Sequence, residues 1–181
     1  LKTMREKLNA IDDLNGSDEE LVDRLKQAKS TYQELESHGP EIEALQTRIA
    51  EITSQYKCGE LAPIAKDVAM LKTKYEAALQ KARKVETGVE TSLHNSLEEV
   101  HQDQTRWLTA AVDKVSWCQD TAGDKYSIEA KLATINDLIS SQDHGKQKTA
   151  VLSQKMELLR ASLDKDRQSE LESKEKTAQK D

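Results

Sequence analysis

The longest regular pattern in the chain is a run of apolar residues that lie three or four positions apart. This run comprises Leu61, Ile64, Val68, Leu71, Tyr75, Ala78, Ala82, Val85 and Val89. A heptad spacing of this kind places every member on one stripe of a helix, and it is typical of helices that pack at a shallow angle. The pattern therefore predicts a long helix that belongs to a bundle or a coiled coil.

The apolar positions continue beyond Val89 as far as Leu97 in steps of four, a spacing that locally changes the winding of the stripe. Gly88 lies at this point, and a single glycine weakens a helix by about 1 kcal/mol relative to alanine without having to end it. Neither proline nor glycine occurs from Val89 to Ala122. We therefore expect one helix from about Pro63 to Thr121.

Two helical segments are predicted before this long helix. The first has apolar residues at Leu1, Met4, Leu8 and Ile11, and it stops at Asn15-Gly16. Ser17 and Glu20 then have the spacing of a capping box, which opens the second segment. The second segment is interrupted at Ser37-His38-Gly39-Pro40, where proline removes a backbone donor. A kink and a complete break both fit this sequence, and we favour the kink.

The N-terminal part of the chain is similar to its C-terminal part. At an offset of 107 residues, Leu1, Met4, Leu8 and Ile11 coincide with Leu108, Ala111, Val115 and Cys118, Asp13 and Gly16 with Asp120 and Gly123, and Leu21 and Leu25 with Ile128 and Leu132. At an offset of 106, His38-Gly39 coincides with His144-Gly145. A repeat of this period with helices of this length predicts tandem helical bundles.

Two segments carry a resemblance to a known family, the spectrin repeats. Thr105-Arg106-Trp107-Leu108 resembles the Trp-Leu pair in the first helix of that repeat. The stretch from Leu71 to Leu79 resembles the aromatic-centred part of its third helix, with Tyr75 where tryptophan is commoner. The resemblance extends over nearly the whole chain. It implies an all-α fold of tandem spectrin-type three-helix coiled-coil bundles, joined by a continuous helix into an elongated rod.

The resemblance and the apolar pattern together predict the domains and their core. We expect one spectrin-type repeat over residues 1–88 with a truncated first helix, and a second over residues 89–181. The predicted structural core residues are Leu71, Tyr75, Trp107, Leu108, Ala111 and Val115. In residues 162–181 eleven of twenty residues are charged, so the second repeat is expected to lack most of its third helix. Either the chain is an excised fragment, or the missing helix comes from elsewhere.

The composition favours long helices over a compact globule with a thick core. Charged residues make up 33% of the 181 residues, and there is no Phe. The net charge of −6 is spread along the chain without a basic block, which argues against binding to nucleic acid or to anionic lipid. No signal-peptide or membrane-span pattern occurs, and Cys58 and Cys118 are interpreted as free thiols of a reducing compartment. We expect a cytoplasmic protein.

The sequence predicts no catalytic, cofactor or metal site. His94 and His101 are seven residues apart, whereas a metal pair on one helical face needs a spacing of three or four. His38 and His144 recur with glycine in the repeat, which favours a shared role at a helix kink. Cys118 is predicted to be an inert core thiol, and Cys58, in a connection, is the more reactive of the two.

Trp117 is the predicted candidate for contact with a partner. It lies ten residues beyond Trp107 and is therefore rotated by about 80° from it around the helix. Packing on the flank of the core, packing at a repeat junction and exposure to a partner protein are all open for this side chain, and flank packing is favoured.

The predicted function is that of a rod, spacer and scaffold. The resemblance implies a segment of an actin-associated cytoskeletal linker of the nesprin, plakin or dystrophin type, which transmits force at the plasma-membrane cortex or the outer nuclear envelope. Its expected partners are cytoskeletal or membrane-linker proteins and a second copy of the chain. The alternative is a recognition module in which the incomplete bundle or Trp117 captures a partner helix. A membrane-bending helical dimer would need a basic concave face, which the sequence lacks.

Overall fold

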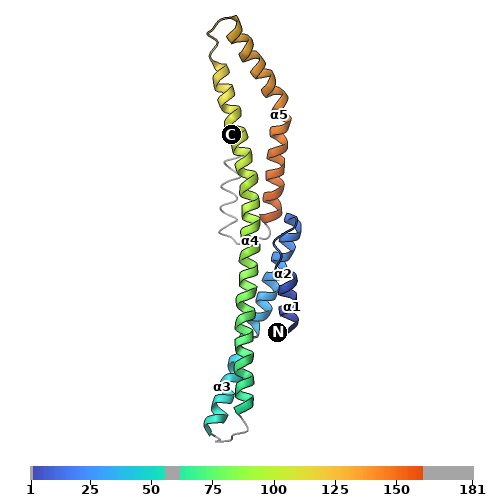
Figure 1. The fold of residues 1–181 in the computed structure, drawn as a ribbon, viewed down its shortest axis with the longest axis vertical. Helices are drawn as coiled ribbons and strands as arrows, with labels where there is room; N and C mark the ends of the chain where they lie inside the picture. The colour runs from blue at the N-terminus through green and yellow to red at the C-terminus, as the bar shows by residue number, and fades with distance from the viewer. Residues whose placement is uncertain (1, 56–61, 161–181) are drawn as a thin grey trace. The chain divides into compact units, whose positions relative to one another are not determined.

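A computed structural model describes residues 2–55 and 62–160, and within these ranges the chain forms helices and no strands (Figure 1). The helices are α1 (Lys2–Ala10), α2 (Asp18–Ser37), α3 (Gly39–Gln55), α4 (Ala62–Gln119) and α5 (Lys125–Arg160). The prediction of an all-α protein with long helices is therefore confirmed. Three features of the sequence analysis lie outside the described residues: Leu1, the connection that contains Cys58, and the polar tail 162–181.

The chain divides into two compact units, Leu1–Ser92 and Leu93–Asp181, which we call unit 1 and unit 2. Helix α4 supplies residues to both units, because it runs from Ala62 to Gln119 without interruption. This confirms the helix that the sequence predicts from about Pro63 to Thr121. Gly88 lies within α4, as expected for a single glycine whose neighbours favour the helix.

Helix α2 begins where the sequence predicts it. Ser17 is its N-cap, the Ser17 Oγ accepts a hydrogen bond from the Glu20 amide, and Glu20 Oε2 accepts one from the Ser17 amide. This reciprocal pair satisfies two of the amide groups that a helix N-terminus leaves without partners. The capping box is confirmed.

The junction between α2 and α3 is a single residue, His38. Its backbone angles are helical (φ −86°, ψ −7°), and its carbonyl accepts a hydrogen bond from the Ile42 amide at 3.2 Å. The helix thus resumes after one residue, which agrees with the predicted kink. At the equivalent His144-Gly145, however, α5 continues without a break, so a helix interruption like the one at His38 is not repeated, and the shared kink role stays a prediction. Lys146 stands there in place of Pro40, and it retains the amide donor that proline lacks.

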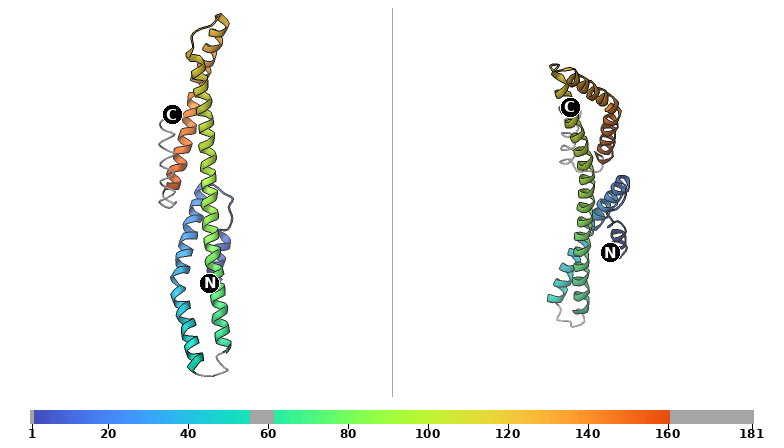
Figure 2. Two further views of the ribbon diagram at one scale, coloured as in Figure 1. Left: turned by 90° about the vertical axis from the view of Figure 1, so that its left-hand side faces the viewer. Right: turned by 45° about the horizontal axis from the view of Figure 1, so that its top comes forward.

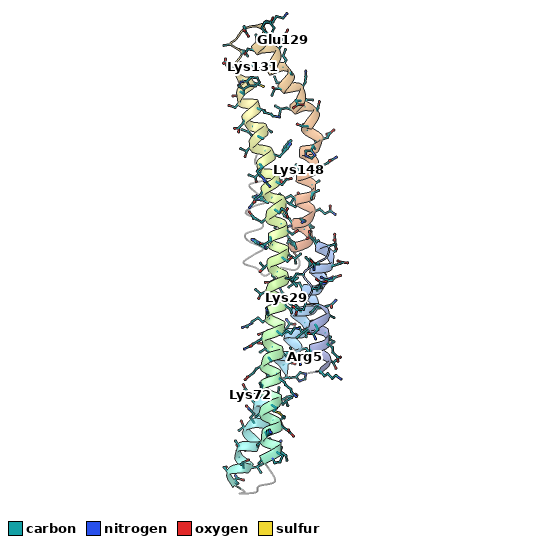
Figure 3. All side chains as sticks on the ribbon, viewed as in Figure 1. Arg5, Lys29, Lys72, Glu129, Lys131 and Lys148 are labelled. Atoms are coloured by element: carbon teal, nitrogen blue, oxygen red, sulfur yellow. The ribbon has the colours of Figure 1, made fainter. Side chains whose placement is uncertain are left out.

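In unit 1, α1 and α2 pack on the first half of α4 (Figures 1 and 2). The core consists mainly of Met4, Leu8, Ile11, Leu21, Val22, Leu25, Ala28, Leu35, Ala78, Ala82, Val85 and Val89. Polar contacts lie at the edge of this core: Lys29 of α2, labelled in Figure 3, pairs with Glu90 of α4 at 3.1 Å, and Lys81 of α4 pairs with Asp12, just after α1, at 3.3 Å. The first half of α4 therefore covers both α1 and α2.

In unit 2, α5 lies antiparallel beside the second half of α4 (Figure 1). The pairs Lys114–Asp137 (3.7 Å), Gln104–Thr149 (3.0 Å) and Lys148–Asp103 set the register. The buried residues are Leu93, Leu97, Gln104, Lys131, Gly145, Leu152, Met156 and Leu159. Most of the apolar burial is thus found where the C-terminal part of α5 lies, and less near the α4–α5 connection.

Candidate interaction surfaces

The connections α1–α2 and α4–α5 have the same internal hydrogen bonds. Arg24 Nη1 donates to the carbonyls of Asp13 and Asn15 at 2.6 and 2.5 Å. Lys131 (Figure 3) stands 107 residues later, and its ammonium donates to the carbonyls of Asp120 and Ala122. In both connections the aspartate accepts a hydrogen bond from the amide two residues on, at 2.9 Å.

The glycines of these connections are also equivalent. Gly16 and Gly123 have φ values of 144° and 145°, a conformation that side chains rarely adopt. The internal repeat read from the sequence is therefore present in the local structure of the two connections. The roles of Arg24 and Lys131 were not predicted, although a basic residue at the same repeat position was the available signal.

The carboxyl of Asp13 has a lowered pKa. The main cause is the hydrogen bond from the Asn15 backbone amide, followed by the one from the Asn15 side chain, and the charge of Arg24 adds to the effect. Each of these favours the ionised form of the carboxyl. The hydrogen bonds of this connection therefore favour the ionised form of the Asp13 carboxyl.

Trp107 packs on a glycine of α5. A Cβ atom added at Gly145 would lie 2.0 Å from the Trp107 ring, so only glycine fits beneath it. The other side of the ring borders a groove of about 470 Å³, which is lined by Gln142, Lys146, Thr149 and Ser153 among others. Trp107 is half-buried, and the outer edge of its ring meets α5 at Gly145.

Six large apolar side chains near the α4–α5 connection have little cover. They are Val112 and Val115 of α4 and Ile128, Leu132, Ile135 and Ile139 of α5, which we call the apolar strip. On α5 they follow the spacing that continues into the groove residues Gln142 and Lys146, so strip and groove lie on the same side of the helix.

The two helices contribute to the strip from the same side of their pair. The α5 residues that face α4 include Lys131, Gly145, Leu152 and Leu159, which are multiples of seven apart. On α5, each strip residue lies three positions before or one position after a position of this seven-residue series. On α4, Val112 lies one position after Ala111, and Val115 lies three positions before Cys118, so the offsets are the same. Two antiparallel helices are related by a two-fold axis perpendicular to the plane that contains them. Residues with the same offset from the contact positions therefore lie on the same side of the pair. The strip is therefore one continuous surface.

Trp117 lies on the opposite flank of α4, because it precedes Cys118 by one residue. Half of its surface is exposed, and the Lys131 ammonium lies 6.0 Å from its ring centroid. Such a cation–π contact contributes about 0.5–1 kcal/mol at an exposed site. The side chain packs at the flank of the helix pair and still presents an open face.

The predicted core residues differ in their burial. Leu71, Tyr75, Trp107, Leu108 and Ala111 are half-buried. Val115 is exposed, so its predicted core role is wrong. Its position is on the flank of α4 and not on the stripe that faces α5, and α5 alone cannot cover both. Ile64 of the first apolar run is exposed as well.

A second groove lies in unit 1 between α3 and the beginning of α4. Its volume is about 470 Å³, and its lining is dominated by small and apolar side chains: Ile49, Ala50, Thr53, Ala65, Val68 and Ala69. No charged side chain lines it. It is a shallow apolar surface without the polar groups that orient a small substrate.

No chemical centre emerges from the described part of the chain. Within residues 2–55 and 62–160, no group of His, Cys, Asp and Glu could hold a metal ion. His38 contacts Glu41 at 3.2 Å, and Cys118 is half-buried, with its thiol donating to the Lys131 carbonyl at 3.6 Å. Cys58 lies outside the described residues. Among the helices described, none is long and apolar enough to cross a membrane.

Comparison with known proteins shows similarity to a much longer protein. In an alignment of 163 positions that covers 87% of the chain, the chain is 28% identical to the Muscle-specific protein 300 kDa of Drosophila melanogaster. The matched segment is 1% of that protein, so the chain spans a very small part of its relative. No protein-family model matches the chain, and no solved structure matches it. The chain is thus similar to a short segment of a much larger muscle-specific protein.

Proposed function

We propose that this chain is a spacer and scaffold segment of a large cytoskeletal linker protein, built from tandem spectrin-type three-helix bundles. The observation that carries the proposal is helix α4, whose 58 residues contribute to both compact units without a break. The matching connections around Arg24 and Lys131 support a tandem repeat. The similarity to a segment of a very large muscle-specific protein supports a place within a long chain.

A mechanical role follows from this construction. Bundles that share a helix have no flexible linker between their sequences, so a pulling force passes through backbone hydrogen bonds and packed side chains. Unfolding one bundle under load would lengthen the segment. The segment has no catalytic role in this proposal. It lies in the cytoplasm with the cytoskeleton, and its partners are other cytoskeletal or membrane-linker proteins.

Pulling on the full chain with optical tweezers tests the proposal. Tethered at its two ends, the chain should lengthen in discrete, reversible unfolding steps. A Leu25→Asp variant, which places a charge in the fully buried core of unit 1, should lose the step that belongs to this unit. A smooth extension without steps would contradict a mechanical bundle.

A recognition role is the second candidate, and the apolar strip of unit 2 favours it. Large contiguous apolar surfaces on monomeric proteins are often binding sites, and each of the six strip residues is 38–65% exposed. Half-exposed Trp117 is a further anchor of the kind found at interfaces. The two candidates are compatible, since a scaffold must offer docking surfaces.

A further inference from the structure

We propose that Asn15 is a site of spontaneous deamidation, whose products loosen the α1–α2 connection of unit 1, and that the α4–α5 connection of unit 2 has no such site. The reaction needs no enzyme, consumes one water molecule and releases one molecule of ammonia. It is a property of the folded chain itself and does not depend on the proposed scaffold role.

Asparagine is chemically labile, because the backbone amide that follows it can attack its side chain. Here the amide nitrogen of Gly16 loses its proton and forms a bond to Cγ of Asn15. The bond from Cγ to Nδ2 breaks, and ammonia leaves. Water then opens the cyclic imide at one of its two carbonyls. Opening at Cγ leaves aspartate at position 15, and opening at the backbone carbonyl leaves isoaspartate, whose main chain runs through the former side chain.

The nucleophile, the amide nitrogen of Gly16, is accessible and unprotected. Asn15 and Gly16 are both exposed and lie between α1 and α2, outside any helix. Gly16 has no side chain that could shield its nitrogen, and its φ of 144° is a conformation that other residues rarely adopt. Its amide donates to no acceptor among the described residues. The nitrogen therefore breaks no hydrogen bond when it reacts.

The side chain of Asn15 is held by one weak contact. Its Nδ2 donates to Asp13 Oδ1 at 2.9 Å, and this hydrogen bond is exposed. An exposed hydrogen bond is exchanged readily for one with water, so its net contribution is small. Rotation of the side chain can then bring Cγ to the Gly16 nitrogen.

The other three asparagines of the chain, Asn9, Asn95 and Asn136, are protected by their helices. They lie in α1, α4 and α5. In a helix the following amide is fixed by its hydrogen bond to the preceding turn and points along the helix axis, away from the asparagine side chain. Each of these asparagines is also followed by a residue with a Cβ atom. We therefore expect Asn15 to react first.

The products lose contacts that hold the α1–α2 connection. A carboxylate at position 15 lacks the Nδ2 donor and brings a second negative charge next to the Asp13 carboxyl. Isoaspartate also inserts one carbon into the main chain, at the place where the Asn15 carbonyl accepts a hydrogen bond from Arg24 Nη1 at 2.5 Å. The turn between α1 and α2 should therefore open more readily.

The α4–α5 connection is a matched internal control. Gly123 has a φ of 145°, almost the value at Gly16, and Lys131 bonds its carbonyls as Arg24 does in unit 1. The residue before Gly123 is Ala122, at the position equivalent to Asn15. Alanine has no side-chain amide, so the same backbone lacks the reactive group.

Ageing of the full chain at mildly alkaline pH tests the site. Peptide mapping by liquid chromatography and mass spectrometry distinguishes asparagine, aspartate and isoaspartate at each position. A synthetic peptide that copies residues 10–21 is the unfolded reference. Asn15→Ala copies the α4–α5 connection and removes the site, whereas Ala122→Asn moves an Asn-Gly pair into that connection and should cause deamidation at position 122.

The structural effect is measured on the same samples. Aged wild type should show a lower midpoint of urea unfolding than fresh wild type, and faster hydrogen exchange in residues 12–24. Aged Asn15→Ala should be indistinguishable from fresh Asn15→Ala in both measurements, because it has nothing to convert in this connection.

Conversion at Asn15 ahead of the other asparagines, together with conversion at position 122 in Ala122→Asn, supports the proposal. An intact Asn15 in the folded chain, at a time when the reference peptide has reacted completely, overturns it, since the folded connection would then protect the amide. Conversion of Asn15 without any change in unfolding midpoint or exchange overturns the predicted loosening.

Discussion

The residue type at position 145 is restricted by a neighbouring side chain. A helix would normally gain about 1 kcal/mol from alanine in place of glycine. At Gly145 this gain is not accessible, because the added Cβ would overlap the rigid end of the Trp107 ring. The aromatic side chain and the glycine have to be considered as one packing unit.

We expect Gly145→Ala to lower the free energy of unfolding by about 1–3 kcal/mol, since overpacking displaces the ring. Gly88→Ala is the matched control: its Cβ would meet Leu14 at 3.7 Å, an ordinary contact, so the variant should be as stable as the wild type or more stable. Urea unfolding measures both. Trp107→Phe removes the ring atoms that clash and should rescue Gly145→Ala. Equal stability of the two glycine variants would disprove the packing argument.

The lowered pKa of Asp13 gives the α1–α2 connection a pH dependence. A carboxyl with a lowered pKa in the folded state stabilises the fold at pH values above its ordinary pKa, and this contribution is lost as the pH falls through the folded value. Asp13→Asn should therefore reduce the stability lost between about pH 5 and pH 3, relative to wild type. Asn15→Ala should have a smaller effect in the same direction, because the backbone hydrogen bond remains. Identical acid profiles for all three proteins would contradict this.

At the level of elements, the long helix is the feature that the sequence predicts best. The heptad run and the absence of proline placed its ends within two residues of Ala62 and Gln119. These signals are local, because they depend on spacing and on backbone chemistry. The capping box of α2 and the kink at His38 were predictable for the same reason.

What an apolar pattern leaves open is which stripe of a helix has a neighbour. Val115 and Leu8 occupy equivalent positions of the repeat, yet one is exposed and the other is buried. The difference in burial comes from the first half of α4, which packs on α1 and α2 in unit 1. Likewise, the sequence analysis placed Gly145 at a kink and did not predict its contact with Trp107. This contact joins segments that are far apart in the sequence. Burial and packing of this kind depend on tertiary neighbours, not on local sequence.

Continuity of α4 leads to a prediction about cooperativity. Val100→Pro removes a helical hydrogen bond and crowds the preceding turn in the middle of the shared helix, which costs about 3 kcal/mol. We expect it to lower the midpoint of thermal unfolding and to split the transition of the two units. Val100→Ala, which keeps the backbone donor, should leave a single transition. A proline variant with unchanged midpoint and cooperativity would show that α4 does not couple the units.

For the molecule as a whole, burial predicts a gradient of stability. Unit 1 has a core covered by three described helices, with Leu8, Leu25, Leu35 and Val89 almost fully buried. In unit 2 the buried residues Leu152, Met156 and Leu159 lie in the last part of α5, whereas the first part carries the uncovered strip. Local opening is easiest where few apolar contacts are lost, so the beginning of α5 should open most readily among these segments.

Hydrogen exchange followed by mass spectrometry measures this gradient directly. Amides of residues 128–139 should exchange fastest within α5, those of residues 152–159 more slowly, and those of residues 21–35 in α2 slowest. Uniform exchange along α5 in the free chain would mean that the strip costs the helix no stability. In that case the exposed apolar side chains would be tolerated singly.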